Sequence, residues 1–249
     1  MKASEILTWL KRNGSKRNVS GMARYGITST GPVVGVSVGT LRAFAKRIGR
    51  DHALAGELWE AGWYESRMLA VFVDEPSRVT RGQMNAWAAG FDNWAICDTA
   101  CFHLFDKTPL AWERVRVWSA APREFVKRAG FALMAALALH DKAAADARFR
   151  PFLPLIERGA ADDRNFVKKG VSWALRGIGR RDRTLNRAAV TVARRLARSD
   201  EPAPRWVGRD ALRELTRGLP GLVTGVILGP GRGPVYLTGL GTALLKLTR

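Results

Sequence analysis

Amphipathic helical periodicity recurs along almost the whole chain, and this repetition limits the fold most strongly. Apolar side chains return every three to four residues in successive segments, which short turns carrying Gly, Pro, Asp or Thr separate. No stretch before residue 219 alternates apolar and polar residues over more than a few positions, so strands are not expected. The predicted helices are residues 3–13, 38–49, 51–61, 64–74, 80–90, 93–105, 109–119, 122–140, 144–158, 163–178, 183–198 and 204–217.

The sequence therefore predicts an all-α protein in which antiparallel helix pairs stack into a curved solenoid with an extended concave face. Residues 17–32 are expected to form a Gly-rich connection rather than a helix. The array is expected to cover residues 1–218. Residues 219–249 contain no Asp or Glu, are rich in Gly and are interrupted by proline, so we expect a disordered tail there.

The charge balance favours a polyanionic partner. Lys and Arg number 41 against 22 Asp and Glu, a formal net charge of +19. A nucleic-acid-coating role, a membrane-surface role and simple composition bias are alternative explanations. Nine Trp argue against the coating role, because coating proteins seldom need so many aromatic anchors.

Two cysteines, Cys97 and Cys101, are too few for a disulfide framework and fit a reducing compartment. They are expected in the core, because a metal site would need two further ligands, and neither metal nor cofactor is expected. The N-terminus has no signal-peptide pattern, and no segment reaches the roughly 18 apolar residues of a membrane span. We expect a cytoplasmic, nucleoid-associated monomer.

Residues 91–105, FDNWAICDTACFHLF, place one carboxylate in an aromatic and apolar helix. Asp98 lies one turn after Trp94 and beside Phe102. A carboxylate there loses hydration, which is costly unless a cation or a catalytic task compensates it. Asp98 either pairs with a cation of a neighbouring helix or carries out chemistry. Arg128, which leads into the apolar run from Ala129 to Leu139, could pair with Asp98 or reach phosphate.

A second candidate surface lies on the helix of residues 163–178. Trp173 points away from its apolar stripe and shares a face with Lys169 and Arg176. It either covers the neighbouring helix or contacts a sugar or base beside phosphates. Basic residues continue downstream, either as a solvated turn or as phosphate contacts: Arg180, Arg181, Arg183 and Arg187.

Several motifs together resemble the DNA alkylation repair family of HEAT-like-repeat alkylpurine DNA glycosylases, the AlkD type. They are GMARYGI at 21–27, GVSVGTLRAFAKRIG at 35–49, ESRMLA at 65–70, FDNWAICD at 91–98, FVKRAGFAL at 125–133 and NFVKKGVSWALRGIG at 165–179. The resemblance covers residues 20–215 in order. The chain departs from the pattern at Gly39, where a proline usually opens the helix, and few helices are expected before residue 35.

The resemblance implies a HEAT-like array that grips double-stranded DNA in a basic groove and excises N3- and N7-alkylated purines without full base flipping. It implies Trp94 and Asp98 as catalytic residues, Arg128 as a groove cation and Trp173 as the second aromatic. An alkylated purine is already cationic and leaves without a general acid, so one carboxylate could suffice. A non-catalytic nucleic-acid-binding scaffold and a protein-binding solenoid are the alternative functions.

Overall fold

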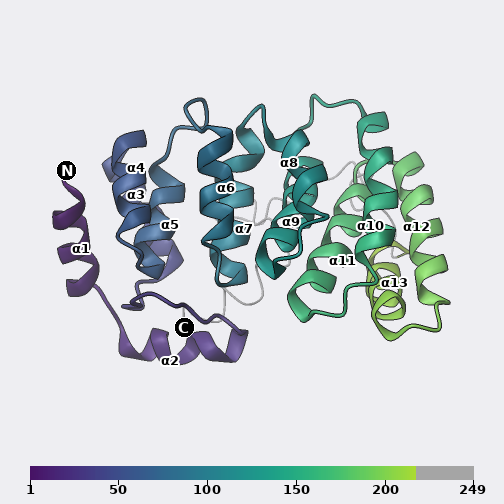
Figure 1. Ribbon diagram of the computed structural model, residues 1–249, viewed down its shortest axis with the longest axis horizontal. Helices are drawn as coiled ribbons and strands as arrows, with labels where there is room; N and C mark the ends of the chain where they lie inside the picture. The colour runs from purple at the N-terminus through teal and green to yellow at the C-terminus, as the bar shows by residue number, and fades with distance from the viewer. Residues whose placement is uncertain (217–249) are drawn as a thin grey trace, which may run out of the picture.

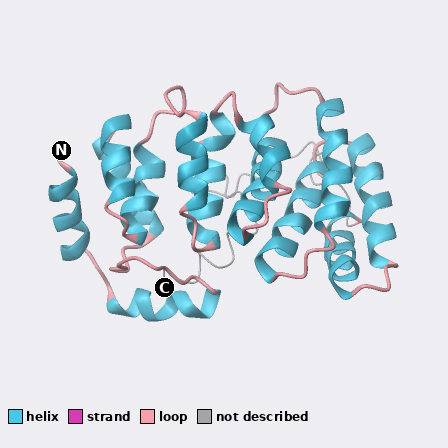
Figure 2. Ribbon diagram, viewed as in Figure 1, coloured by secondary structure: helices cyan, strands magenta, loops and turns pink. Residues whose placement is uncertain are grey.

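A computed structural model describes residues 1–216, and helices make up most of that part (Figure 1, Figure 2). No strand occurs among residues 1–216. The α-helices are α1 (Ala3–Arg12), α2 (Lys16–Met22), α3 (Val38–Ile48), α4 (His52–Glu60), α5 (Tyr64–Val73), α6 (Arg81–Ala89), α7 (Trp94–His103), α8 (Ala111–Trp118), α9 (Glu124–His140), α10 (Leu153–Gly159), α11 (Asn165–Gly179), α12 (Arg183–Ala197) and α13 (Pro202–Leu215). The 3₁₀ helices are η1 (Ala23–Tyr25), η2 (Phe105–Lys107) and η3 (Asp146–Phe152).

From α3 to α12 successive helices stand side by side, as expected for a solenoid, whereas α2 runs across the lower edge of the array (Figure 1). The helices α3, α5, α7, α9, α11 and α13 contact one another in this order and form one layer. The predicted all-α solenoid of helix pairs is confirmed. The predicted tail, residues 219–249, lies outside the described residues.

Local sequence accounts for where many helices begin. Asn93 caps α7 by accepting hydrogen bonds from the backbone N–H groups of Ala95 and Ile96, both at 3.0 Å. Ser37 caps α3 in the same way through the N–H of Thr40, at 3.2 Å. Asp98 follows Asn93 by five residues, in the middle of α7, so the point at which the helix begins sets where the candidate carboxylate lies.

The helix α9 is the centre of the array, and its residues from Arg128 to Ala138 are all buried. It packs against α7, α8 and α11. A side chain at Gly130 would place its Cβ 2.4 Å from the backbone nitrogen of Ser119, so only glycine permits this approach of α9 to the end of α8. The apolar run that follows Arg128 is therefore buried on every side as far as Ala138.

The structure corrects two predicted boundaries. The expected connection at 17–32 contains the helices α2 and η1. None of the α2 residues is buried, so α2 has no apolar stripe and gives no periodic signal. The single helix expected at 144–158 is divided into η3 and α10, because Pro151 and Pro154 interrupt the helical hydrogen bonds there.

Among residues 1–216, no helix has both the length and the apolar character that crossing a bilayer requires.

Candidate active site

A cavity of about 670 Å³ opens where four layer helices meet the N-terminal segment. Its walls come from the segment 24–26 and from α7, α9, α11 and α13. The cavity brings together Trp94, Asp98, Arg128, Lys169, Trp173 and Arg176, which sequence analysis singled out on three separate helices. Its other lining residues are Arg24, Tyr25, Gly26, Asn165, Phe166, Trp206 and Asp210.

Asp98 and Arg128 form a buried, bidentate ion pair at the cavity wall. The Nε of Arg128 donates to one carboxylate oxygen of Asp98 at 2.8 Å, and a terminal nitrogen donates to the other at 2.7 Å. The other terminal nitrogen donates to the carbonyl of Phe166 at 2.6 Å. The two side chains are 2% and 7% exposed. The pairing of Asp98 with a cation of a neighbouring helix is therefore confirmed, and Arg128 is that cation.

This pair leaves both groups with capacity for a ligand. A guanidinium has five N–H donors, and the three bonds to Asp98 and Phe166 use three of them. A carboxylate has about four lone-pair sites, of which Arg128 occupies two. Burial raises the pKa of Asp98 above its usual range, although the Arg128 charge acts in the opposite direction.

Trp94 is held at the mouth of the cavity by the N-terminal segment. Its indole nitrogen donates to the carbonyl of Tyr25 at 2.9 Å. Gly26 follows with φ of 66°, and a Cβ there would lie 3.1 Å from the ring of Phe166. The stretch before residue 35 therefore supplies a wall of the site. Residues Tyr25 and Phe166 were not singled out in the sequence, because neither stands out from its neighbours in charge or periodicity.

Trp173 stacks face to face on Phe102, with ring centroids 4.6 Å apart and planes 5° from parallel. Phe102 in turn meets the edge of His140, whose Nδ1 lies 2.5 Å from a carboxylate oxygen of the buried Asp106. One face of Trp173 is thus occupied by Phe102, and the ring borders the cavity that holds Asp98. Phe102 was recognised in the sequence only as a neighbour of Asp98.

The cations of α11 differ in their partners. Lys169 is exposed at the cavity. Arg176 is ion-paired with Glu214 of α13 and also donates to the carbonyl of Ser172 at 3.3 Å. Arg180, close beside it, pairs with the same glutamate. Glu214 therefore already neutralises part of the basic strip.

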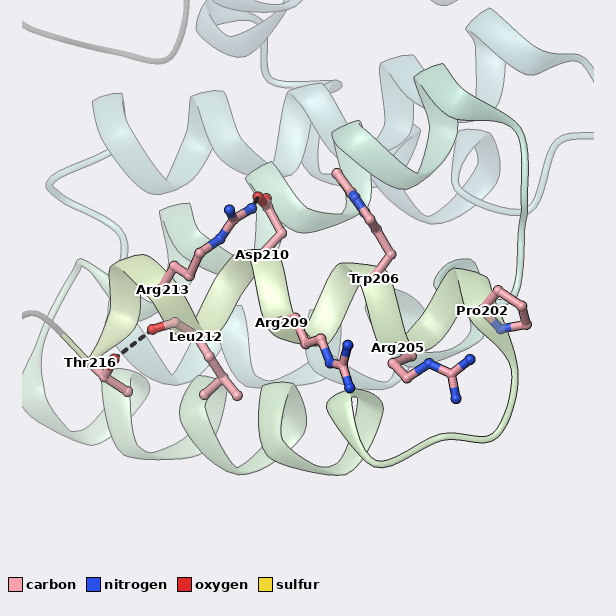
Figure 3. A pocket seen from close by; sticks show the side chains of 8 residues that line it. All are labelled: Pro202, Arg205, Trp206, Arg209, Asp210, Leu212, Arg213 and Thr216. Carbon is pink, nitrogen blue, oxygen red and sulfur yellow. Dashed lines mark hydrogen bonds and ion pairs between the residues drawn. The ribbon is translucent and has the colours of Figure 1, made fainter.

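The helix α13 contributes Trp206 and Asp210 to the wall of this cavity. Figure 3 shows both side chains where they also line a second, more open pocket on α13. Trp206 and Asp210 point towards the neighbouring helices, whereas Arg205 and Arg209 extend away from them. Trp206 adds a third tryptophan to the cavity wall, and the Lys168 ammonium lies 5.4 Å from its ring centroid. Trp206 was not predicted as a site residue, although an aromatic residue between Arg205 and Arg209 is a usable sequence signal.

Comparison with known proteins identifies the family and the fold of the chain. Residues 6–215 match the family described as DNA alkylation repair enzyme. The chain belongs to that family. No curated protein matches. A solved structure described as "A new family of proteins related to the HEAT-like repeat DNA glycosylases with affinity for branched DNA structures" is similar, with 19% identity and a TM-score of 0.73. The match covers 88% of this chain and 96% of that one, and it shows a shared HEAT-like fold.

In this member of the DNA alkylation repair family, three of the predicted DNA-binding residues do not line the cavity: Arg181, Arg183 and Arg180, the last of which pairs with Glu214. Arg181 is 6% exposed and pairs with Asp146 at 2.8 Å, while its remaining nitrogens donate to three backbone carbonyls. Arg181 is therefore a structural residue, and the expectation that it contacts phosphate is wrong on geometric grounds. Arg183 is exposed, but it lies on α12, which contributes nothing to the cavity wall.

The cysteines of α7 are core residues, as predicted. Cys97 and Cys101 are buried free thiols whose sulfur atoms lie 3.5 Å from the carbonyls of Phe125 and Ala129. Across residues 1–216, no group of three or more His, Cys, Asp or Glu side chains is placed to hold a metal ion.

Proposed function

We propose that this protein is a DNA glycosylase that hydrolyses the N-glycosidic bond of N3- and N7-alkylated purines in duplex DNA. The observation that carries the proposal is the Asp98 carboxylate, held by Arg128 at the wall of a cavity that Trp94 and Trp173 also line. A buried carboxylate, large aromatic faces and adjacent cations match the parts that such a reaction needs.

The chemistry follows from the charge of the substrate. An alkylated purine carries a positive charge and leaves as a neutral base, so no general acid is required, unlike in ordinary glycoside hydrolysis. As the bond breaks, positive charge develops on the sugar, and the Asp98 carboxylate stabilises it and orients the attacking water. Arg128 keeps that carboxylate in one orientation, and two lone-pair sites of Asp98 remain for sugar and water.

The aromatic residues hold the lesion nucleotide beside Asp98. The faces of Trp94 and Trp173 contact the sugar and the cationic base, because an indole face attracts positive charge. Lys169, Arg128 and Arg176 contact the flanking phosphates. We further propose that the lesion stays in or near the stack, and that the protein works as a monomer close to the nucleoid without a cofactor.

A non-catalytic DNA-binding scaffold is the second candidate. It is favoured by the similar solved structure, whose description names affinity for branched DNA and relates its family to the glycosylases. Such a scaffold would use the same concave cations and would leave Asp98 as a purely structural partner of Arg128.

Release of free base distinguishes the two functions. The purified full chain is incubated with methylated duplex, and 7-methylguanine and 3-methyladenine are measured by chromatography beside an Asp98→Asn control. We expect release by the wild type and a large loss of rate in the variant, with DNA affinity almost unchanged. Binding of the duplex without release above the buffer rate would reject the enzyme and favour the scaffold.

A further inference from the structure

The exposed face of α12 carries a row of arginines separate from the candidate active site. Arg183, Arg187, Arg194 and Arg198, the residue that caps the helix end, stand at i, i+4, i+11 and i+15. At about 100° per residue these positions fall within roughly 60° of one another on the helix circumference. All four are exposed, and we name them the α12 arginine stripe.

The opposite face of α12 builds the core. Its buried residues point away from the stripe: Leu185, Ala189, Val192, Ala193 and Leu196. Between Arg187 and Arg194 the stripe is flanked by Thr191, which is polar, and by Val190, which is partly buried against the core. The stripe therefore has no large apolar side chain that could enter a lipid surface, which disfavours membrane binding.

The stripe is not neutralised by its surroundings. Residues 183–198 contain no Asp or Glu. Within residues 1–216, none of the four stripe arginines forms an ion pair, whereas Arg195, beside the stripe, pairs with Glu157 at 3.1 Å. Like charges at i and i+4 on a helix repel one another, so the arrangement destabilises α12 unless an anionic partner binds it.

The stripe does not face the cavity that holds Asp98. No α12 residue lines that cavity, and α12 stands at the edge of the array (Figure 1). A duplex in the cavity is contacted from α7, α9, α11 and α13, so the stripe needs a different occupant. Residues 219–249 contain no acidic side chain, and their charge opposes docking of this segment on arginines.

We propose that the α12 arginine stripe binds the phosphate backbone of a second double-helical DNA segment while the concave cavity holds the first. Arg183 and Arg198 are separated by 15 helical steps, roughly 22 Å, a length over which one strand of a duplex presents about six phosphates. Four guanidiniums along that length match phosphate charge without reading bases. The proposal rests on DNA binding by the concave face, as stated under the proposed function.

The test compares a short linear duplex with a four-way junction made from arms of the same sequence. Binding of the full chain is measured by fluorescence anisotropy over a range of KCl concentrations. The test variant carries Arg187→Gln and Arg194→Gln, which remove two charges from the centre of the stripe. The matched control carries Arg12→Gln and Arg116→Gln, exposed arginines on α1 and α8 that line no cavity described above.

We expect the test variant to bind the junction at least tenfold more weakly, with a salt slope smaller by about 1.8 because two phosphate contacts are lost. Its affinity for the short duplex and its base release should equal those of the wild type, and the control should bind both DNAs as the wild type does.

Three outcomes would overturn the proposal: an unchanged junction affinity, an equal loss on the short duplex, or an equal loss in the control. Binding of the wild type to phosphatidylserine vesicles, lost in the test variant while junction binding persists, would also overturn it in favour of a lipid surface. Failure of base release leaves the junction comparison intact, so the two proposals fail separately.

Discussion

Removal of Arg128 should destabilise the protein more than any exposed substitution, because it leaves a buried carboxylate without its cation. The Asp98 side chain is 2% exposed, and its hydrogen-bond donors in the described structure come from Arg128 alone. Breaking a buried pair from one side costs about 3–5 kcal/mol. For a chain of this size we expect Arg128→Ala to lower Tm by roughly 6–20 °C, at about 2–4 °C per kcal/mol.

Substitution of the other partner, Asp98, should lower the free energy of unfolding by less. Asp98→Asn keeps the side-chain size and an acceptor oxygen for Arg128, and a weakened hydrogen bond to a charged group costs about 1.5–3 kcal/mol. The double variant Asp98→Asn, Arg128→Ala removes both charges and completes a double-mutant cycle with the two single variants. Its loss should fall short of the sum of the single losses by about 1–3 kcal/mol, because the two residues are in contact.

Urea denaturation gives the free energy of unfolding for the three variants, and single-turnover base release on the same preparations gives the rate. The proposed chemistry requires that Asp98→Asn folds and binds duplex but releases no base. The buried-pair reasoning would be refuted if each single variant lost under about 1 kcal/mol of unfolding free energy and the double variant lost the sum of the two. A stable Asp98→Asn variant with wild-type release would refute the catalytic role.

The remaining predictions concern the surroundings of the pair. Glu214→Gln should remove the closer carboxylate partner of Arg176 and leave only Asp210, at 4.0 Å. Binding to undamaged duplex should tighten by about two- to fivefold, as expected for loss of an ion pair worth up to about 1 kcal/mol, with a steeper salt dependence in anisotropy. Phe102→Leu removes a stack on Trp173 worth about 0.5–1.5 kcal/mol and should slow single-turnover release about three- to tenfold, while Phe102→Tyr should retain the wild-type rate. Burial and neighbouring cations lower the pKa of His103 to about 3, so the unfolded chain takes up a proton below about pH 6.5 and the folded protein does not. Stability should therefore decrease as pH falls from 6.5 towards 3, and a His103→Gln variant that shows the same decrease in urea denaturation would contradict this cause.

Local sequence was sufficient for the helical class and for most helix positions. The apolar stripe Val167, Val171, Ala174 and Ile178 of α11 is fully buried, as its spacing predicts. Periodicity succeeds here because burial of one helix face depends on residues only three to four apart. It failed for α2, which buries no residue and therefore has no apolar stripe; its Asn18 instead donates to the carbonyl of Gly35 at 2.8 Å, 17 residues away in the sequence.

The site itself depended on tertiary structure. Sequence could place Asp98 and Arg128 as possible partners, but 30 residues separate them, and only the packing of α9 against α7 joins them. The basic stretch from Arg176 to Arg183 shows most clearly that sequence alone does not predict the surroundings of a side chain. Arg176 is ion-paired at the cavity, the Arg181 side chain is buried beside Asp146, and Arg183 is exposed on α12. Residues close in sequence have different surroundings because their side chains point in different directions around a helix and the chain turns between helices. The amino-acid sequence determined which charges the protein carries, and the tertiary structure decided which of them are free to meet DNA.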